Sequence, residues 1–330
     1  MTLHSCLNAG AFFTGRAPPF TATGTLYAMT DFKRIALVAS LDMPKVTATL
    51  NRLAQLLPEH GHEVVIESGT AKLMTADNLP LCDRDQLGGR VDLAIVVGGD
   101  GSMLAAGRDL VDNGVPLLGV NRGRLGFLTD IMPEQVDSRL MEVLAGRYQI
   151  SDRHLLYMRV LRRGQMVGEG LALNDVVIHP GMSVRMMEFE LYVDDQFVYS
   201  QRSDGLIVST PTGSTAYALS GGGPIVHPKL NATVLVPMNP HTLSNRPIVV
   251  DGDSNIRIYV GQRRELQPHI TCDGQMHIVS EPGDAIEIER YARPVRLIHP
   301  SEHNFYETCR DKLGWGSHLG NSQPSDFFHR

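Results

Sequence analysis

Apolar and polar positions alternate with two different periods between about residues 33 and 147. Short runs rich in β-branched residues predict buried strands, and apolar residues spaced three and four apart predict helices. The predicted strands cover 34–39, 64–66, 92–98 and 116–120, and the predicted helices cover 44–58, a segment from Ser102, and 133–144. This alternation is typical of a parallel sheet with helices on both faces, in which ligands bind at the carboxyl ends of the strands.

After about residue 150 the pattern changes to short strands with a period of two. Predicted strands cover 155–161, 188–193, 197–199, 232–237, 246–250, 255–260, 285–289 and 295–298. Asp194-Asp195 is placed to close a hairpin between two of them. The pattern predicts a mostly β, sandwich-like domain, whose last strands can return the chain toward the first domain.

The two patterns divide the chain into four parts. Residues 1–28 lack periodicity and the apolar core of a signal peptide, so we expect a disordered extension, with Met29 as an alternative start. A Rossmann-like α/β domain follows over 29–150, then the mostly β domain over 151–316, and a polar tail over 317–330.

Composition narrows the function classes. The chain has 330 residues, 42% of them hydrophobic, which suffices for two domains with cores of their own. Its net charge of −6, without a basic stripe, argues against a nucleic-acid partner. No apolar run approaches the roughly 18 residues of a membrane span. The four scattered cysteines, with no Cys-x-x-Cys pair, indicate reduced thiols and a cytoplasmic protein.

The first candidate site is the run Gly-Gly-Asp-Gly-Ser at 98–102, where a buried strand meets the start of a helix. Glycines allow close backbone approach, and free N–H groups at a helix start attract phosphate. A carboxylate there repels the phosphate that its neighbours attract. Asp100 therefore suggests chemical work, as a proton acceptor or a metal ligand, although an ordinary turn aspartate remains an alternative.

The run 203–217 contains a second short apolar strand that ends in a hydroxyl-rich and glycine-rich loop, and the run continues to Pro224. Its hydroxyls and amides can hold phosphate or ribose, and Tyr217 can stack on a base. Asn174 and Asp175 precede another apolar strand and can bind a base edge and sugar hydroxyls. Ordinary capped turns are the alternative for both segments. The turn at 272–275 has the same ambiguity, and His299 and His303 are expected to be solvated loop histidines rather than a zinc site.

Taken together, these motifs resemble the NAD kinase family. The resemblance rests on the glycine-rich turn at 98–101, Asn174-Asp175, the segment 204–217 and the run Asp-Gly-Gln at 273–275. Segments 240–243 and 313–315 are similar to bacterial members, and the resemblance covers about residues 33–316. Diacylglycerol-type lipid kinases and phosphofructokinases share the first turn, so the run Thr-Pro-Thr-Gly-Ser-Thr-Ala-Tyr at 210–217 is the more specific motif.

The resemblance implies transfer of the γ-phosphoryl group of ATP to the 2′-hydroxyl of the adenosine ribose of NAD, giving NADP. It implies that Asp100 is the general base and that Mg²⁺ is held mainly by the nucleotide. Positions that match NAD-contacting residues are Asp100, Gly101, Asn174, Asp175, Arg185, Arg202, Asp204, Thr215, Ala216, Tyr217, Ala218, Leu219, Ser220 and Gln275.

Several points stay open on the sequence. Some family members also accept polyphosphate, and Arg202 can either pair with donor phosphates or be a surface arginine. The family implies a homodimer or homotetramer. A related lipid kinase predicts an apolar acyl-chain pocket and a membrane-facing surface, neither of which the sequence signals. A dinucleotide-binding regulator without activity would be favoured by loss of Asp100, which is present.

Overall fold

The computed structural model describes residues 32–39, 44–75, 78–123, 126–181, 183, 185–242, 244–261 and 267–315. The predicted extension 1–28 and tail 317–330 lie outside the described residues. Among the described residues, no helix is both long and apolar enough to cross a membrane. The three described cysteines, Cys82, Cys272 and Cys309, are buried free thiols.

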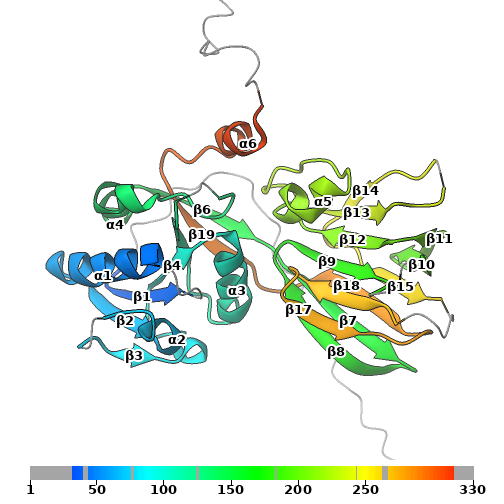
Figure 1. The fold of residues 1–330 in the computed structure, drawn as a ribbon, viewed down its shortest axis with the longest axis horizontal. Coiled ribbons are helices and arrows are strands. Elements are labelled where there is room, and N and C mark those ends of the chain that lie inside the picture. The colour runs from blue at the N-terminus through cyan, green and yellow to red at the C-terminus, as the bar shows by residue number, and fades with distance from the viewer. Residues whose placement is uncertain are drawn as a thin grey trace, which may run out of the picture. The chain divides into compact units, whose positions relative to one another are not determined.

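Seven strands of the described chain form the first sheet, in the order β3-β2-β1-β4-β5-β19-β6 (Figure 1). All pair in parallel except β6, which is antiparallel to β19. The strands are β1 (Arg34–Ala39), β2 (Glu63–Glu67), β3 (Leu81–Cys82), β4 (Leu93–Gly98), β5 (Leu117–Asn121), β6 (Tyr148–Arg153) and β19 (Val295–Pro300). The last strand of the chain does return to the first sheet, as the sequence allowed, while the domain division at residue 150 stays a prediction.

Alternate residues of these strands pack on opposite faces of the sheet. The helices are α1 (Pro44–Glu59), α2 (Ser68–Ala71), α3 (Asp100–Leu110), α4 (Met141–Leu144), α5 (Tyr217–Ser220) and α6 (Phe305–Leu313). Ile35 and Leu37 pack with Leu50 of helix α1. Ala36 and Val38 face the other way and pack in a second cluster, which contains the apolar residues of helix α3. Helices α1 and α3 therefore cover opposite faces, which confirms the predicted doubly covered sheet (Figure 1).

Two predicted helices differ from the observed ones. Helix α3 begins at Asp100 rather than at Ser102, with Gly99 as its N-cap. The segment 133–144 is a 3₁₀ turn (Pro133–Gln135), a π-helical turn (Val136–Leu140) and α4 rather than one continuous helix. Val136, Leu140 and Val143 nevertheless all reach the core, so packing overrides regular geometry there.

Two six-stranded antiparallel sheets form the mostly β region, in the orders β11-β10-β15-β18-β7-β8 and β14-β13-β12-β9-β16-β17. Their strands are β7 (Leu156–Arg162), β8 (Gln165–Ala172), β9 (Asp175–His179), β10 (Met187–Val193), β11 (Gln196–Ser203), β12 (Gly205–Ser209), β13 (Ala232–Met238), β14 (Ile248–Asp251), β15 (Ile256–Val260), β16 (His269–Cys272), β17 (Met276–Val279) and β18 (Ala285–Arg290). The predicted hairpin between β10 and β11 is confirmed, with Asp194 and Asp195 both at positive φ.

The two sheets pack face to face. Residues such as Phe189 and Ile286 from one sheet and Ile178 and Leu206 from the other share a single buried cluster. On the outer face of the second sheet, Ile207 and its neighbours are covered by Ala218 of α5. This face carries the carboxyl end of β12 and the glycine-rich segment after it, so the sandwich is the scaffold of the site described below.

Candidate functional site

Asp100 is half-buried at the first turn of α3, directly after β4. An acidic side chain is favourable there because the helix N-terminus carries a partial positive charge. Its Oδ2 accepts a hydrogen bond from the Phe127 amide at 2.9 Å, and its Oδ1 accepts one from the Leu128 amide at 3.0 Å. Asp100 is therefore a positioned carboxylate with one bond on each oxygen.

A cavity of about 770 Å³ lies against the second β-sheet. It is lined by Asn174, Asp175, Val177, His179, Pro180, Ser183, Asp204, Ala216, Tyr217, Met238, Thr271, Asp273 and Gly274. Asp175, Val177 and His179 are alternate residues of β9, so they face the same side of the sheet. The cavity combines apolar walls with amide, carboxyl and phenol groups, which is typical of small-molecule sites.

Asp175 is buried at the wall of this cavity. Burial, followed by the nearby charge of Asp273, raises the pKa of the Asp175 carboxyl to about 7. A carboxyl group with this pKa changes charge near neutral pH and can donate or accept a hydrogen bond according to its protonation. Perturbed carboxyl groups of this kind are enriched at functional sites.

The turn between β16 and β17 supplies Asp273. Asp273 and Gly274 both have positive φ, of 53° and 63°, which is the backbone geometry of a tight type I′ hairpin. The Asp273 carboxylate accepts hydrogen bonds from the amides of Leu173, Asn174 and Asp175, at 3.1, 2.7 and 3.3 Å. Asp273 thereby holds the backbone of the segment that carries two cavity-lining side chains.

Two side chains join this turn to the helix of Asp100. Arg108 of α3 forms an ion pair with the fully buried Asp273 carboxylate and donates to the Gln275 amide oxygen. Gln275 in turn donates from Nε2 to the carbonyl of Gly101 at 3.0 Å. The glycine-rich turn at 98–101, which follows β4 of the seven-stranded sheet, is thus held to the β16–β17 turn at the cavity.

The hydroxyl-rich segment after β12 packs tightly on the same backbone. The Thr210 amide donates to the Asn174 carbonyl at 2.9 Å, and the Thr210 hydroxyl donates to the Leu173 carbonyl at 2.6 Å. At Gly213 a Cβ atom would lie 2.1 Å from the Asn174 carbonyl oxygen. Glycine is required here by close approach of two backbones, which explains one residue of the run at 210–217.

The structure gathers only part of the predicted set around the cavity. Lining residues from that set are Asn174, Asp175, Asp204, Ala216 and Tyr217. Asp100, Gly101 and Gln275 belong to the adjoining network described above. The remaining predicted residues, Arg185, Arg202, Thr215, Ala218, Leu219 and Ser220, do not line the cavity. Arg202 lies on β11, where its Nε pairs with a Glu188 oxygen at 3.1 Å, and Ala218 is buried against the sheet.

Sequence reasoning missed His179, Pro180, Met238 and Thr271 as lining residues. The period of two along β9 provides the signal for His179, since it shares a face with Asp175. Burial, and then His269 and His277, lower the pKa of His179, which favours its neutral form in the cavity wall. Met238 and Thr271 come from β13 and β16, and their approach depends on strand order, which the sequence does not specify.

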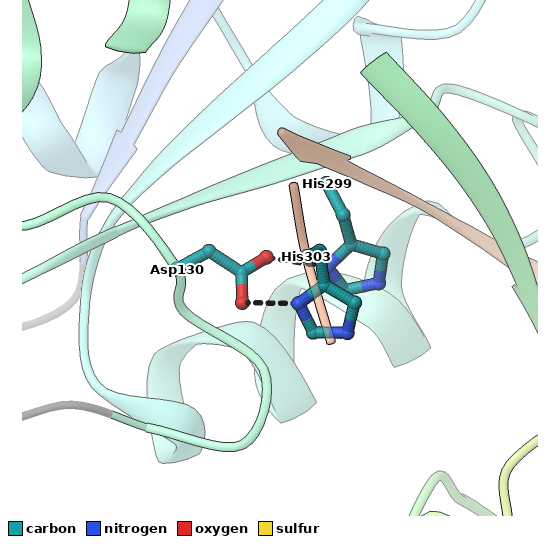
Figure 2. Close-up of side chains that lie close together, drawn as sticks. All are labelled: Asp130, His299 and His303. Carbon is teal, nitrogen blue, oxygen red and sulfur yellow. Dashed lines mark hydrogen bonds and ion pairs between the residues drawn. The ribbon is translucent and has the colours of Figure 1, made fainter. Parts of the chain in front are cut away.

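The expectation of a solvated loop histidine was wrong for His299, whereas His303 does lie in a loop and is partly exposed. His299 is buried on β19, and its ring stacks on that of His303 with centroids 4.0 Å apart. Figure 2 shows that both Nδ1 atoms face the Asp130 carboxylate, with which both form hydrogen bonds. Strand β19 lies between β5 and β6, and this pairing, which the local sequence does not reveal, buries His299. Among the described residues this is the one group of three close metal-ligating side chains.

Solved structures provide a comparison for the fold. Yeast NADH kinase complexed with NADH aligns with a TM-score of 0.77 at 22% identity, covering 89% of this chain and 91% of its own. An NAD kinase from Archaeoglobus fulgidus in complex with ATP aligns with a TM-score of 0.66 at 26% identity, covering 84% of this chain and 99% of its own. Both support the combination of an α/β sheet and a β-sandwich.

Sequence relatives are closer. The NAD kinase of Chromohalobacter salexigens is 54% identical over 292 residues, covering 88% of this chain and all of that protein. The NAD kinase of Saccharophagus degradans is 53% identical over 292 residues, covering 88% of this chain and 99% of its own. Residues 35–148 match the ATP-NAD kinase N-terminal domain, and residues 173–300 match the ATP-NAD kinase C-terminal domain. The chain therefore belongs to the ATP-NAD kinase family of phosphotransferases.

Proposed function

We propose that this enzyme transfers the γ-phosphoryl group of ATP to the 2′-hydroxyl of the adenosine ribose of NAD, giving NADP and ADP. The observation that carries the proposal is the hydrogen bond from Gln275 to the Gly101 carbonyl. It supports the proposal because it joins the helix turn that carries Asp100 to the β16–β17 turn, whose Asp273 and Gly274 line the cavity.

Asp100 is the general base in this proposal. Its carboxylate takes the proton of the 2′-hydroxyl as that oxygen attacks the γ-phosphorus and the bond to ADP breaks. The two backbone amides on its oxygens hold the side chain in place without adding a charge. The first backbone N–H groups of α3 supply donors for the transferring phosphoryl group.

The cavity holds NAD. Asn174 can pair with a base edge through its donor and acceptor, and Asp175 and Asp204 can accept from ribose hydroxyls. Tyr217 is exposed at the cavity wall, where its ring can stack on a base. The related yeast enzyme was solved with NADH and the archaeal enzyme with ATP, which supports nucleotide binding by this fold.

Mg²⁺ would neutralise the donor phosphates and orient the γ-phosphoryl group. Asp100 offers a single carboxylate, and the only group of three close metal-ligating side chains among the described residues, Asp130, His299 and His303, is largely buried. These observations fit an ion held mainly by the nucleotide, with at most one protein carboxylate, as is usual for Mg²⁺.

The donor and the assembly belong to the same proposal. We infer ATP as the donor, and we expect a homodimer or homotetramer in the cytoplasm. Arg202 pairs with Glu188, so it must exchange that partner if it is to bind donor phosphates. Of the two interpretations of Arg202, a surface ion pair is the one that its contacts favour.

The test is NADP formation by the purified full chain with NAD, Mg²⁺ and either ATP or polyphosphate. Asp100→Asn keeps the shape of the side chain but removes its basicity, so turnover should fall about 10²–10⁴-fold while the Kd for NAD changes little. Asp109→Asn on the same helix removes an exposed carboxylate that pairs with Arg84, and it should leave turnover unchanged.

Three outcomes would contradict the proposal. Absence of NADP with either donor from folded protein would reject the reaction. Near-normal turnover of Asp100→Asn would reject the assigned base. Product formed only with polyphosphate would reject ATP as the donor.

A further inference from the structure

The first residues of the segment 126–131 hold the Asp100 carboxylate in place. The Phe127 and Leu128 amides donate to Asp100, as described above. Gly126 packs so closely that a Cβ atom there would lie 2.1 Å from Asp100 Oδ1. A small displacement of this segment would therefore move or release the carboxylate.

The other end of the segment is fixed by Asp130. Its carboxylate accepts from His299 Nδ1 on β19 and from His303 Nδ1 just before α6, the latter at 3.0 Å. Figure 2 shows the two rings stacked one on the other, each presenting Nδ1 to a different carboxylate oxygen. Segments about 170 residues apart in sequence thus meet at one side chain.

The charge states favour this arrangement. Burial by itself would raise the pKa of Asp130, but its contacts with His299 and His303 outweigh burial and hold that pKa well below its ordinary value. Burial lowers the pKa of His299, so a neutral ring that donates from Nδ1 is favoured. A buried arginine, Arg153, adds a positive charge near both groups. That charge disfavours a divalent cation at this cluster and favours a hydrogen-bonded clamp.

Two further contacts, both with Asn121, restrict the movement of the 126–131 segment. Thr129 is buried, and its hydroxyl accepts from Asn121 Nδ2 at 2.9 Å. The backbone N–H of Asn121, the last residue of β5, donates to the Ile131 carbonyl at 2.7 Å. Only one residue separates Leu128 from Asp130, so a shift at Asp130 must reach the amides that hold Asp100.

We propose that Asp130, clamped by His299 and His303, is a positioning residue that sets the 126–131 segment so that Asp100 is held for proton transfer. The inference deepens the proposed function and rests on Asp100 as the base. The chain end at β19 and α6 thereby contributes to catalysis without touching substrate. None of the three clamp residues lines the NAD cavity.

Paired variants of His303 test the clamp. His303→Phe keeps a ring for stacking on His299 but removes the donor to Asp130. His303→Asn keeps an N–H donor at nearly the same position but removes the ring. Misplacement of a catalytic group by about 1 Å can lower turnover by two orders of magnitude. We therefore expect kcat of His303→Phe to fall at least about ten-fold and His303→Asn to recover most of the activity. The Kd for NAD should stay within about two-fold in both.

Hydrogen exchange provides a readout that does not depend on activity. The Phe127 and Leu128 amides should exchange faster in His303→Phe than in the wild type or in His303→Asn. Asp284→Ala is the control for general destabilisation, because Asp284 is a buried carboxylate outside the 126–131 segment and pairs with Arg162 of β7. The melting temperature of Asp284→Ala should fall. Its kcat, normalised to the folded enzyme that binds NAD, should not change, and neither should the hydrogen exchange of the backbone amides at 126–131.

The inference is overturned if His303→Phe retains kcat within about two-fold, or if exchange at 126–131 is unaffected. It is also overturned if Asp284→Ala, at a matched loss of melting temperature, loses as much kcat as His303→Phe. Failure of the wild-type chain to form NADP would instead reject the proposed function, and the exchange comparison would still decide whether the clamp fixes the segment.

Discussion

Replacing Arg108 by methionine should destabilise the fold, because it leaves a buried carboxylate without its cation. The Asp273 side chain is 0% exposed and that of Arg108 is 14% exposed, so solvent cannot take over the role of the guanidinium. Breaking one side of a buried ion pair costs about 3–5 kcal/mol. Three backbone amides still donate to Asp273, which places the expected cost near the lower end, about 3 kcal/mol.

The assay is urea unfolding followed by circular dichroism, with thermal melting beside it. A loss of about 3 kcal/mol corresponds to a melting temperature lower by roughly 4 °C in a chain of this size. The Kd for NAD should also rise, since Asp273 holds the backbone of Asn174 and Asp175 at the cavity. The matched control is Arg52→Met, which breaks an exposed pair with Asp137 and should cost less than about 1 kcal/mol.

A double variant separates the unpaired charge from the lost packing. Arg108→Met with Asp273→Asn removes both charges, so it should cost less than the sum of the two single changes, by about 1–3 kcal/mol. If Arg108→Met costs no more than Arg52→Met, the ion pair does not stabilise the fold and the reasoning fails. Strict additivity in the double variant would refute the coupling in the same way.

Three further changes probe the cavity. Burial, and then Asp273, raise the pKa of Asp175 from 3.8 to about 7, so the folded chain binds this proton more tightly than the unfolded chain and loses stability as pH rises from about 4 to 7. Asp175→Asn should remove that loss, giving on the order of 2–4 kcal/mol more stability than the wild type at pH 8 and little difference below pH 4, as measured by urea unfolding. Tyr217→Ala should raise the Kd for NAD about 2–10-fold by calorimetry, with Tyr217→Phe near the wild type, because a stacked ring contributes about 0.5–1.5 kcal/mol. Gly213→Ala should cost at least about 1–3 kcal/mol in the same unfolding assay, since its Cβ would meet the Asn174 carbonyl at 2.1 Å; unchanged stability would show that this contact relaxes freely.

Local pattern was sufficient for most of the elements. The alternation of periods before residue 150 predicted the strands of a parallel sheet, and residues such as Ile35 and Ala36 do reach opposite cores. Hydrophobic period is a local property of the chain, so it can be read without knowing the neighbours of a strand. Helix start points are less well determined, and α3 begins two residues before the predicted Ser102.

The candidate site was only partly accessible from the sequence. Asp100, Asn174-Asp175 and the run at 210–217 stand out because glycines, hydroxyls and carboxylates follow apolar strands. The contacts of Arg108 and Gln275 that bring these segments together could not be predicted from the sequence. The residues around an arginine on a helix do not indicate which distant carboxylate it pairs with. The predicted residues Arg202 and Ala218 have an ion pair and a packing role instead of a place in the cavity wall.

The sequence by itself determined most of the strands and helices and which turns carry reactive groups, because period and turn chemistry depend on residues close together in the chain. Only the tertiary structure decided that β19 enters the first sheet, that Asp273 holds the Asn174 backbone, and that His299 and His303 clamp Asp130. These contacts join residues about 100 to 170 positions apart, and strand order and burial select them.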